Sequence, residues 1–349
     1  MVKHSENIIV GVSIGDMNGI GPEVVLKTFE DTRMLDICTP VIFANAKIVS
    51  FLKRTYNLNA FIQGIDKLDQ IVLGKINVLN VWREGVNLEN GKLNEEIGKY
   101  AIKSFQAATT ALKSNQIDVL VTAPINKYNI QAEDYKFAGH TDYLNEQLEG
   151  EALMFMIHED VKVGLITDHV PIADLSKHIN SKLIEKKINT IHQSLIADFK
   201  INKPKIAVLG LNPHSGDNGV IGKEDDEIVK PSLEKIFKSG IQVFGPFSAD
   251  SFFGSNQYKN YDAVVAMYHD QGLIPFKTLS FGEGVNFTAG LNKVRTSPDH
   301  GTGFDIAGKN IANESSFREA VYSAIDIYKN RMEYIELTNN PLKKGTGKV

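Results

Sequence analysis

The sequence predicts an α/β protein with a mostly parallel sheet. Short apolar runs of strand length alternate along the chain with longer segments of helical periodicity. Polar or glycine-rich segments follow several of the apolar runs directly, as they do at the carboxyl ends of parallel strands. The chain has 349 residues, which is long for one ordinary core. We therefore expect two domains.

The predicted strands are short and rich in β-branched residues. They cover 8–14, 40–44, 76–81, 117–122, 161–167, 206–211 and 261–267. Apolar residues at helical spacing predict amphipathic helices, which cover 94–113, 179–195 and 317–328. The basic, glycine-containing tail 343–349 is expected to be mobile.

The composition is that of a globular protein, with 42% hydrophobic and 23% charged residues. A formal net charge of −4 argues against general nucleic-acid binding. The single cysteine, Cys38, excludes an intramolecular disulfide and a cysteine metal cluster. No apolar run is long enough to span a membrane, and the first residues do not resemble a signal peptide. We therefore expect a cytoplasmic protein.

A glycine-rich turn follows the first predicted strand, at 15–23. Pro22 and Glu23 fit the first turn of a helix. A turn between strand and helix can bind an anion or a cofactor, or it can be a plain connection. The turn lacks the P-loop pattern, and the chain contains no G-x-G-x-x-G. A dinucleotide would therefore not bind in the usual Rossmann way.

Three histidines, His169, His214 and His269, each come just after a predicted strand. Imidazoles from three strand ends can form a site for a divalent cation with one position open. The alternative is a set of polar loops in which each histidine bonds the backbone. The carboxylates Asp250 and Asp270 lie in neighbouring segments. Spacing alone leaves both interpretations open.

Several polar residues elsewhere suit an anionic ligand. Lys277 and Arg295, with Asn286, could hold a phosphate. His140 precedes Thr141 at the expected start of a helix, which suits either an anion contact or local capping. Lys127, after the strand at 117–122, could bind a phosphate or carboxylate, or could be a solvated lysine.

The segments that carry these residues resemble the 4-hydroxythreonine-4-phosphate dehydrogenase family of vitamin B6 biosynthesis. The resemblance runs from about residue 8 to about residue 328. It rests on GDMNGIGPE, TAPINK, FAGHTDYL, LNPHSGDNG, GPFSADSFF, AMYHDQGLIPFK and TSPDHGTGFDIAGK. In the first motif, 16–19 reads Asp-Met-Asn-Gly where many relatives have Pro-Ala-Gly, which leaves fine specificity open.

The resemblance implies a two-domain α/β/α fold like that of the isocitrate and isopropylmalate dehydrogenases. An outer, cofactor-side domain would comprise 1–125 with 285–349. A metal-ligand and dimerisation domain would comprise 126–284. The family binds its substrate at a dimer interface, so a homodimer with shared active sites is expected.

The implied reaction is the NAD-dependent oxidative decarboxylation of 4-(phosphooxy)-L-threonine to 3-amino-2-oxopropyl phosphate and CO2. NADP is the alternative cofactor, and the metal is expected to be zinc, with cobalt or magnesium as alternatives. The resemblance assigns the metal to His169, His214 and His269. It assigns a catalytic role to Asp250 and Asp270, either of which could relay protons or orient a histidine ligand. It assigns the substrate to His140, Thr141, Lys277, Asn286 and Arg295, and the cofactor to His300, Gly301 and Asp305.

Related enzymes act on D-threonate or D-erythronate 4-phosphate, and one branch acts on aromatic cis-dihydrodiols. Lys277 and Arg295 favour a phosphorylated substrate over a dihydrodiol. A protein on the same scaffold that binds metal or phosphate without catalysis is the other alternative, although the ligand histidines and the cofactor loop are all present.

Overall fold

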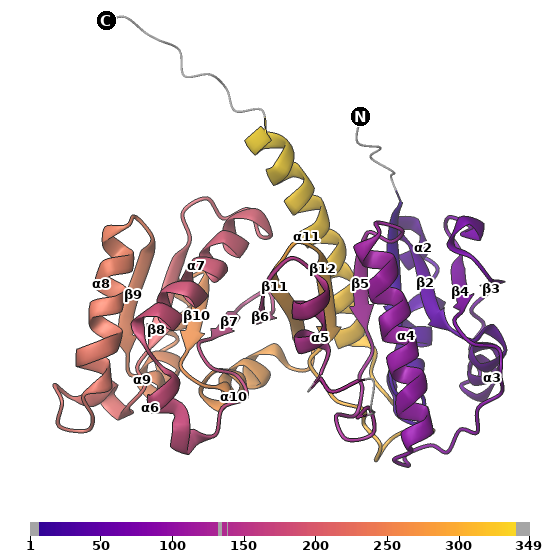
Figure 1. The fold of residues 1–349 in the computed structure, drawn as a ribbon, viewed down its shortest axis with the longest axis horizontal. Coiled ribbons are helices and arrows are strands. Elements are labelled where there is room, and N and C mark those ends of the chain that lie inside the picture. The colour runs from indigo at the N-terminus through magenta and orange to yellow at the C-terminus, as the bar shows by residue number, and fades with distance from the viewer. Residues whose placement is uncertain (1–6, 132–134, 138, 340–349) are drawn as a thin grey trace, which may run out of the picture.

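The computed structural model describes residues 7–131, 135–137 and 139–339. A twelve-stranded sheet runs the length of the molecule in the order β3-β4-β2-β1-β5-β12-β11-β6-β7-β10-β8-β9 (Figure 1). The strands are β1 Ile8–Ser13, β2 Cys38–Ala44, β3 Ile62–Ile65, β4 Ile76–Asn80, β5 Val119–Thr122, β6 Gly150–Ile157, β7 Lys162–Leu165, β8 Lys205–Leu209, β9 Gln242–Phe247, β10 Ala263–Ala266, β11 Val285–Leu291 and β12 Val294–Pro298. The helices are α1 Gly21–Glu30, α2 Met34–Ile37, α3 Ala46–Thr55, α4 Glu95–Lys113, α5 His140–Gln147, α6 Leu175–His178, α7 Ser181–Ala197, α8 Lys230–Lys238, α9 Ala249–Gly254, α10 His269–Ser280 and α11 Ser315–Asn339.

Both outer parts of the sheet are parallel, and its centre is antiparallel. β11 runs antiparallel to β12 and to β6, and β6 runs antiparallel to β7. β12 pairs in parallel with β5, and β10 pairs in parallel with β7 and β8. The central antiparallel strands therefore join two parallel sheets into one.

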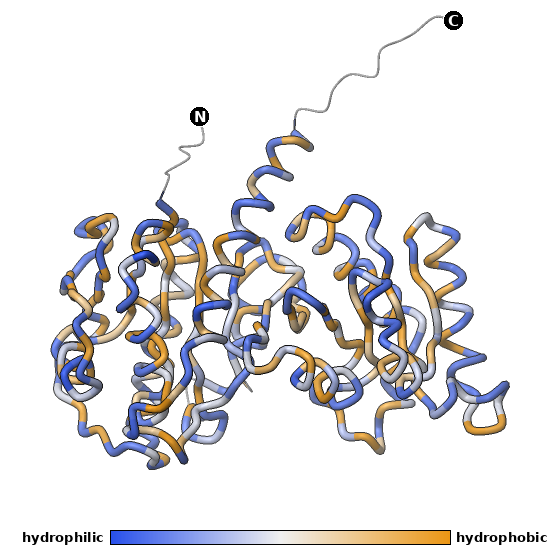
Figure 2. Tube along the Cα trace, turned by 180° about the vertical axis from the view of Figure 1, so that it is seen from behind, coloured by the Kyte–Doolittle hydropathy of each residue, from blue (hydrophilic) through white to orange (hydrophobic). Residues whose placement is uncertain are grey.

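Side chains along each strand alternate between the two faces of the sheet. Both faces carry apolar side chains, and helices cover both. Ile42 and Ala44 of β2 belong to the core that contains α1, α3 and α11, whereas Val41 and Phe43 pack with α4. In the other half of the molecule, α9 and α10 cover one face. Hydrophobic residues accordingly concentrate along the strands when the chain is coloured by hydropathy (Figure 2). The predicted α/β class is confirmed.

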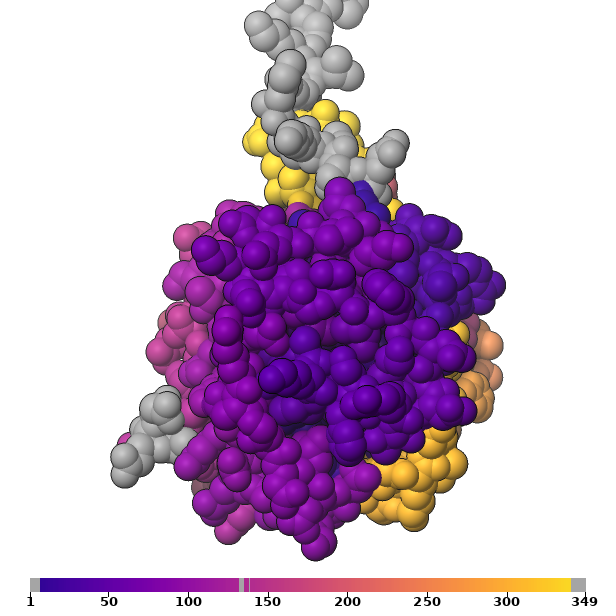
Figure 3. All heavy atoms as spheres, turned by 90° about the vertical axis from the view of Figure 1, so that its right-hand side faces the viewer, coloured from indigo at the N-terminus to yellow at the C-terminus, as the bar shows by residue number. Residues whose placement is uncertain are grey.

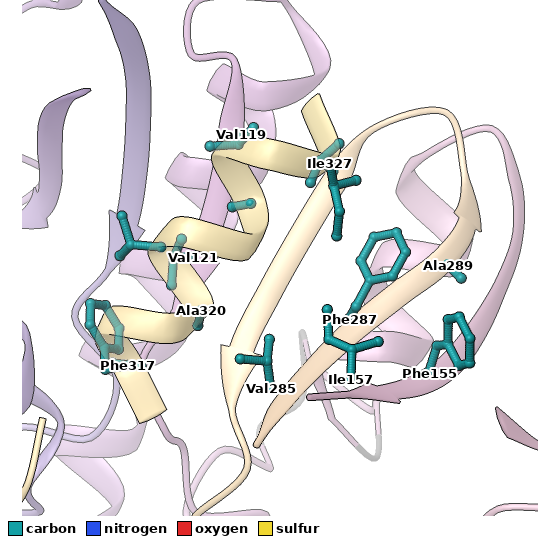
Figure 4. Close-up of a cluster of buried hydrophobic side chains, with 14 of the residues drawn as sticks. Val119, Val121, Phe155, Ile157, Val285, Phe287, Ala289, Phe317, Ala320 and Ile327 are labelled. Carbon is teal, nitrogen blue, oxygen red and sulfur yellow. The ribbon is translucent and has the colours of Figure 1, made fainter. Parts of the chain in front are cut away.

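The core is continuous across the middle of the sheet. Ile157 and Val285, from β6 and β11, lie beneath α11, whose Phe317 and Ile327 are also buried (Figure 4). α11 contacts β5, β11 and β12. One long helix thus packs across the junction of the two parallel parts.

The predicted elements are present, most with small shifts at their ends, whereas α11 runs to Asn339, 11 residues beyond the predicted end at 328. The helix expected over 94–113 is α4, and its N-cap Asn94 accepts a hydrogen bond from the backbone N–H of Glu96 at 2.8 Å. Prediction missed β3, β6, β9, β11 and β12. The last two lie inside the polar, glycine-rich segment 284–309. The tail 343–349 lies outside the described residues, and the division into two domains stays a prediction.

Two further features bear on the sequence predictions. Cys38 is buried in β2, and burial raises the pKa of its thiol to about 12. Across the described ranges, every helix is too short or too polar to cross a membrane.

Candidate active site

A cavity of about 380 Å³ lies between the two parallel parts of the sheet, and most of the predicted site residues line it. Those that line it are His140, Thr141, His169, His269, Lys277, Asn286, Arg295, His300 and Gly301. Met154 and Met156 of β6 contribute apolar surface. The antiparallel strands at the centre of the sheet therefore pass directly behind the cavity.

Arg295 is the most deeply buried cation of the cavity, with 2% of its surface exposed. Its Nε and Nη2 atoms donate to Oγ1 of Thr122 at 3.1 and 2.5 Å, and Nη1 donates to Oγ1 of Thr288 at 3.1 Å. Burial lowers the pKa of this guanidinium to about 9. No carboxylate in the described ranges contacts it. A buried charge without a counter-ion is costly, so the site favours an anionic ligand.

His140 adds a neutral hydrogen-bond donor beside Arg295. Nη2 of Arg295 donates to Nδ1 of His140 at 3.0 Å, so the imidazole proton must sit on Nε2. Burial, and then the charge of Arg295, lower the pKa of His140 well below its usual value. Its Nε2, like Oδ1 of Asn286, is buried without a partner among the described residues. Both groups are therefore available to a ligand.

His169 and His269 come together because the ends of β7 and β10 run side by side. The backbone N–H groups of Ile166 and Thr167 donate to the carbonyls of Ala266 and Met267 at 2.9 and 3.2 Å. The two imidazole centroids are 6.1 Å apart. These two histidines form one wall of the cavity, so two of the three histidines expected at strand ends lie close together.

Asp270 orients His269. Its Oδ1 lies 2.7 Å from Nδ1 of His269, which leaves Nε2 of that ring free for a ligand. A carboxylate bound to the outer nitrogen of a metal-binding histidine fixes the ring and its tautomer. Of the two acidic residues singled out from the sequence, Asp270 therefore lies in contact with a candidate ligand.

His214 is not part of this wall. It is exposed in a short 3₁₀ segment, Pro213–Gly216, and does not line the cavity. Its φ of 53° is left-handed, and Ser215 and Asp217 follow with φ of 51° and 44°. Such a run is strained for residues with a Cβ. The buried carboxylate of Asp225 holds the loop by accepting from the N–H groups of Leu211 and Asn212 at 2.8 and 2.9 Å.

Within one chain, the expected ligands do not meet. Among residues 7–131, 135–137 and 139–339, no group of three or more His, Cys, Asp or Glu side chains is arranged to hold a metal ion. Asp250 also lies outside the cavity, where Ser248 donates a hydrogen bond to its Oδ1 at 2.6 Å. That bond, with a smaller effect of the nearby His214, lowers the pKa of Asp250.

The glycine-rich segment after β12 forms the remaining wall. His300 and Gly301 line the cavity, and Nε2 of His300 is a further buried atom without a partner in the described structure. A Cβ added at Gly301 would meet no atom within 4 Å, so the space beside this residue is open. Asp305 is exposed and does not line the cavity.

This segment is fixed to the first glycine-rich turn. The backbone N–H of Ile20 donates to the carbonyl of Thr302 at 2.8 Å. A Cβ at Gly19 would lie 2.5 Å from that same carbonyl oxygen, so glycine permits the close approach. Figure 3 views the end of the molecule that carries the N-terminal strands. There the segment near residue 300, in orange to yellow, lies beside N-terminal segments in indigo to purple.

Three residues of the site were missed or left open by the sequence predictions. Gln271 joins two strand ends, accepting from the N–H of Met267 at 2.7 Å and donating to the carbonyl of Gly210 at 2.6 Å. Asp168 lines the cavity beside His169. Lys127 also lines it, and its position after a buried strand was the available signal.

Comparison with known proteins agrees with this description. The family profile described as "Pyridoxal phosphate biosynthetic protein PdxA" matches residues 36–324. A 4-hydroxythreonine-4-phosphate dehydrogenase of Bacteroides thetaiotaomicron is 43% identical over 339 residues, which cover 97% of this chain and 93% of the relative. A relative of Oceanobacillus iheyensis named for D-threonate 4-phosphate dehydrogenase is 34% identical over 328 residues, which cover 93% of this chain and 98% of the relative.

The fold is also that of solved dehydrogenases. The crystal structure of 4-hydroxythreonine-4-phosphate dehydrogenase from Klebsiella pneumoniae superimposes with a TM-score of 0.79 at 31% identity, covering 94% of this chain and 99% of that one. The protein is therefore an oxidoreductase of the dehydrogenase class. It belongs to the PdxA family, the pyridoxal phosphate biosynthetic dehydrogenases.

Proposed function

We propose that this chain catalyses the NAD-dependent, divalent-metal-dependent oxidative decarboxylation of 4-(phosphooxy)-L-threonine to 3-amino-2-oxopropyl phosphate and CO2. The observation that carries the proposal is the buried Arg295 without a carboxylate partner in the described structure. Together with Nε2 of His140 and Oδ1 of Asn286, it supports a ligand that is anionic and polar. Names of the relatives make a phosphorylated hydroxy acid the leading candidate.

Arg295 and Lys277 are the proposed phosphate ligands. Nζ of Lys277 donates to the backbone carbonyl of Asp299 at 2.7 Å, which holds the ammonium at the cavity edge. The neutral imidazole of His140 can donate from Nε2 to a phosphate oxygen without competing for the charge. Thr141, beside it at the start of α5, is the other proposed contact.

A divalent cation fits two imidazoles of one chain and a third from another copy. Nε2 of His269 is free because Asp270 occupies Nδ1. His169 lines the same cavity, and Nζ of Lys127, which lies 3.3 Å from its Nε2, would move off that atom when a cation binds. His214 would come from the partner in a homodimer, because it lies outside its own cavity. When bound, the cation would stabilise the ionised substrate hydroxyl and the charge that develops during decarboxylation.

An exposed apolar groove supports the homodimer. It has a volume of about 550 Å³ between α9 and α10, and the residues that line it include Phe253, Ile274, Asp250 and Asp270. Ile274 is 65% exposed. An apolar patch rimmed by charges suits a protein interface. In the proposed two-fold dimer, His214 and Asp250 of each chain would act in the site of the other.

The dinucleotide is assigned to the wall formed by His300 and Gly301. The open space at Gly301 and the unpartnered Nε2 of His300 support this, as does the anchoring of the segment on Ile20. Asp305 follows on the exposed part of the segment and is the third proposed contact. NAD is the expected hydride acceptor, with NADP as the alternative.

D-threonate 4-phosphate is the second candidate substrate, because a relative 34% identical carries that name. D-erythronate 4-phosphate is part of the same alternative, as a substrate of related enzymes. A turnover assay should follow NADH formation with all three phosphorylated acids, in the presence of Zn²⁺, Co²⁺ or Mg²⁺. We expect the highest kcat/KM for 4-(phosphooxy)-L-threonine. A higher value for either sugar-acid phosphate would favour the second candidate, and turnover of none would reject both.

A further inference from the structure

Lys127 is a cation of the cavity to which the proposed function gives no ligand. Its Nζ atom lies 3.3 Å from Nε2 of His169, and both side chains line the cavity. An ammonium group can only donate hydrogen bonds. Within the described ranges its side chain forms no ion pair, and this imidazole is its polar contact. Its position therefore suits contact with an anionic group of a bound ligand.

The loop that carries Lys127 is held by a buried carboxylate. Oδ2 of Asp16, which is fully buried, accepts from Nδ2 of Asn129 at 2.7 Å, and the N–H of Asp16 donates to the carbonyl of Pro124 at 2.9 Å. On the far side, Nε2 of Gln131 donates to the carbonyl of Lys127 at 3.2 Å. The backbone is thus tied on both sides of the lysine. Such ties are expected where a side chain must be presented to a ligand.

The proposed substrate carries two anions. Its phosphate is assigned to Arg295 and Lys277, which leaves Lys127 as the third lysine or arginine on the cavity wall. Lys127 lies beside His169, on the side where the proposed metal would hold the reacting hydroxyl. The carboxylate that is lost in the reaction is two carbons from that hydroxyl, so it falls near the same wall.

We propose that Lys127 binds the substrate carboxylate, and that Asp16 and Asn129 position it. This rests on the proposed function, because it requires a substrate with both a phosphate and a carboxylate. Loss of CO2 removes the anion that Lys127 holds while the phosphate contacts persist. Lys127 therefore discriminates between the substrate and ligands that lack its carboxylate.

The test is isothermal titration calorimetry without NAD, so that no turnover occurs. The ligands are 4-(phosphooxy)-L-threonine and 1-amino-3-(phosphooxy)propan-2-ol, which lacks the carboxylate, both with Mg²⁺ present. We expect Lys127→Met to weaken substrate binding by at least about tenfold, as for loss of a charge-assisted hydrogen bond. Binding of the second ligand should stay within about twofold. Lys127→Arg should restore most of the substrate affinity.

Controls separate binding from folding. Lys99→Met, at an exposed position of α4, should leave both affinities unchanged. Thermal unfolding should show that each variant is folded. Asp16→Asn should weaken substrate binding selectively but less than Lys127→Met, as expected of a positioning residue.

Three outcomes would overturn the proposal. Equal losses for both ligands would mean that Lys127 holds the phosphate. Unchanged affinities would mean that it is a solvated lysine. Wild-type protein that bound neither ligand would overturn the proposed function, and this assignment with it.

Discussion

Arg295 donates a hydrogen bond to His140 at 3.0 Å across 155 positions of the sequence. The bond joins β12 to the first residue of α5 and fixes the tautomer of a buried imidazole. The cavity is thus lined by a cation, its neutral neighbour, two further histidines and an amide oxygen that has no partner in the described part of the chain.

Replacing Arg295 should reduce kcat/KM for the phosphorylated substrate by at least about tenfold, because a charge-assisted contact is worth roughly 1.5–3 kcal/mol. Arg295→Lys should recover only part of the loss, since a lysine cannot reproduce the planar fork. Steady-state kinetics with phosphorylated and unphosphorylated substrate provide the measurement, and Arg54→Lys on α3 is the control. Unchanged discrimination between the two substrates would contradict the assignment.

His140 should make stability depend on pH. Its pKa is lowered in the folded chain, whereas a histidine in the unfolded chain titrates near ~6.5. As the pH falls below that value, the unfolded chain takes up a proton that the folded chain resists, so the free energy of unfolding falls. Urea unfolding from about pH 7.5 to about pH 5.5 should show a smaller fall for His140→Gln than for wild type. His178→Gln, exposed on α6, should behave like wild type.

Mixing two inactive variants should restore activity if the site is shared. In heterodimers of His214→Ala with Lys277→Ala, one site keeps an intact cavity and receives an intact partner histidine. Random exchange should therefore give about a quarter of wild-type activity.

The matched control mixes His169→Ala with Lys277→Ala. These two residues line the same cavity, so both sites of every mixed dimer stay broken and activity should stay absent. Recovery in both mixtures, or in neither, would argue against His214 acting across the interface. A monomer by light scattering at assay concentration would also reject the shared site.

Asp270→Asn should weaken divalent-metal binding by about 10–100-fold, because a carboxylate behind a ligand histidine tunes its orientation and basicity. Competition with a chelating indicator measures this without turnover. Asp36→Asn, at an exposed position of α2, is the control. Equal metal affinity in all three proteins would show that Asp270 has no part in the site.

Lys27→Met should destabilise the fold by about 1–3 kcal/mol. Nζ of Lys27 donates to the fully buried Glu23 at 2.7 Å and to the carbonyl of Ala312 at 3.0 Å. Removing the ammonium leaves a buried carboxylate without its cation. Urea unfolding measures the loss, and adding Glu23→Gln should recover part of it. A double variant no more stable than Lys27→Met would contradict this account.

The proximity of His169 and His269 follows from a local rule, although the sequence predicted a site of three histidines and His214 does not line the cavity. Parallel strands place their carboxyl ends at one edge, so His169 and His269 could be expected to meet. Arg295 was named as a ligand but not as a buried one. Its strand lies in a polar, glycine-rich segment. It pairs with the preceding strand β11, but its pairing with β5 joins residues about 175 positions apart. No local pattern marks so distant a partner.

His214 shows a different limit. Its position after β8 was predicted, yet its direction depends on a run of left-handed residues and on Asp225, which lies 11 positions further along the chain. Asp250 lies near His214 rather than in the cavity, and the sequence could not predict this position either. Both positions follow from tertiary contacts and, on the proposed function, from a second chain.

The buried Cys38 has a practical consequence. Because its thiol is inaccessible and its pKa is raised, the natural chain should be almost inert to maleimide dyes. A cysteine introduced on an exposed helix would then be the reactive thiol of the subunit. Pairs of such labels, one beside Arg295's strand and one on α10, would report by energy transfer whether the two halves of the molecule approach one another when ligands bind.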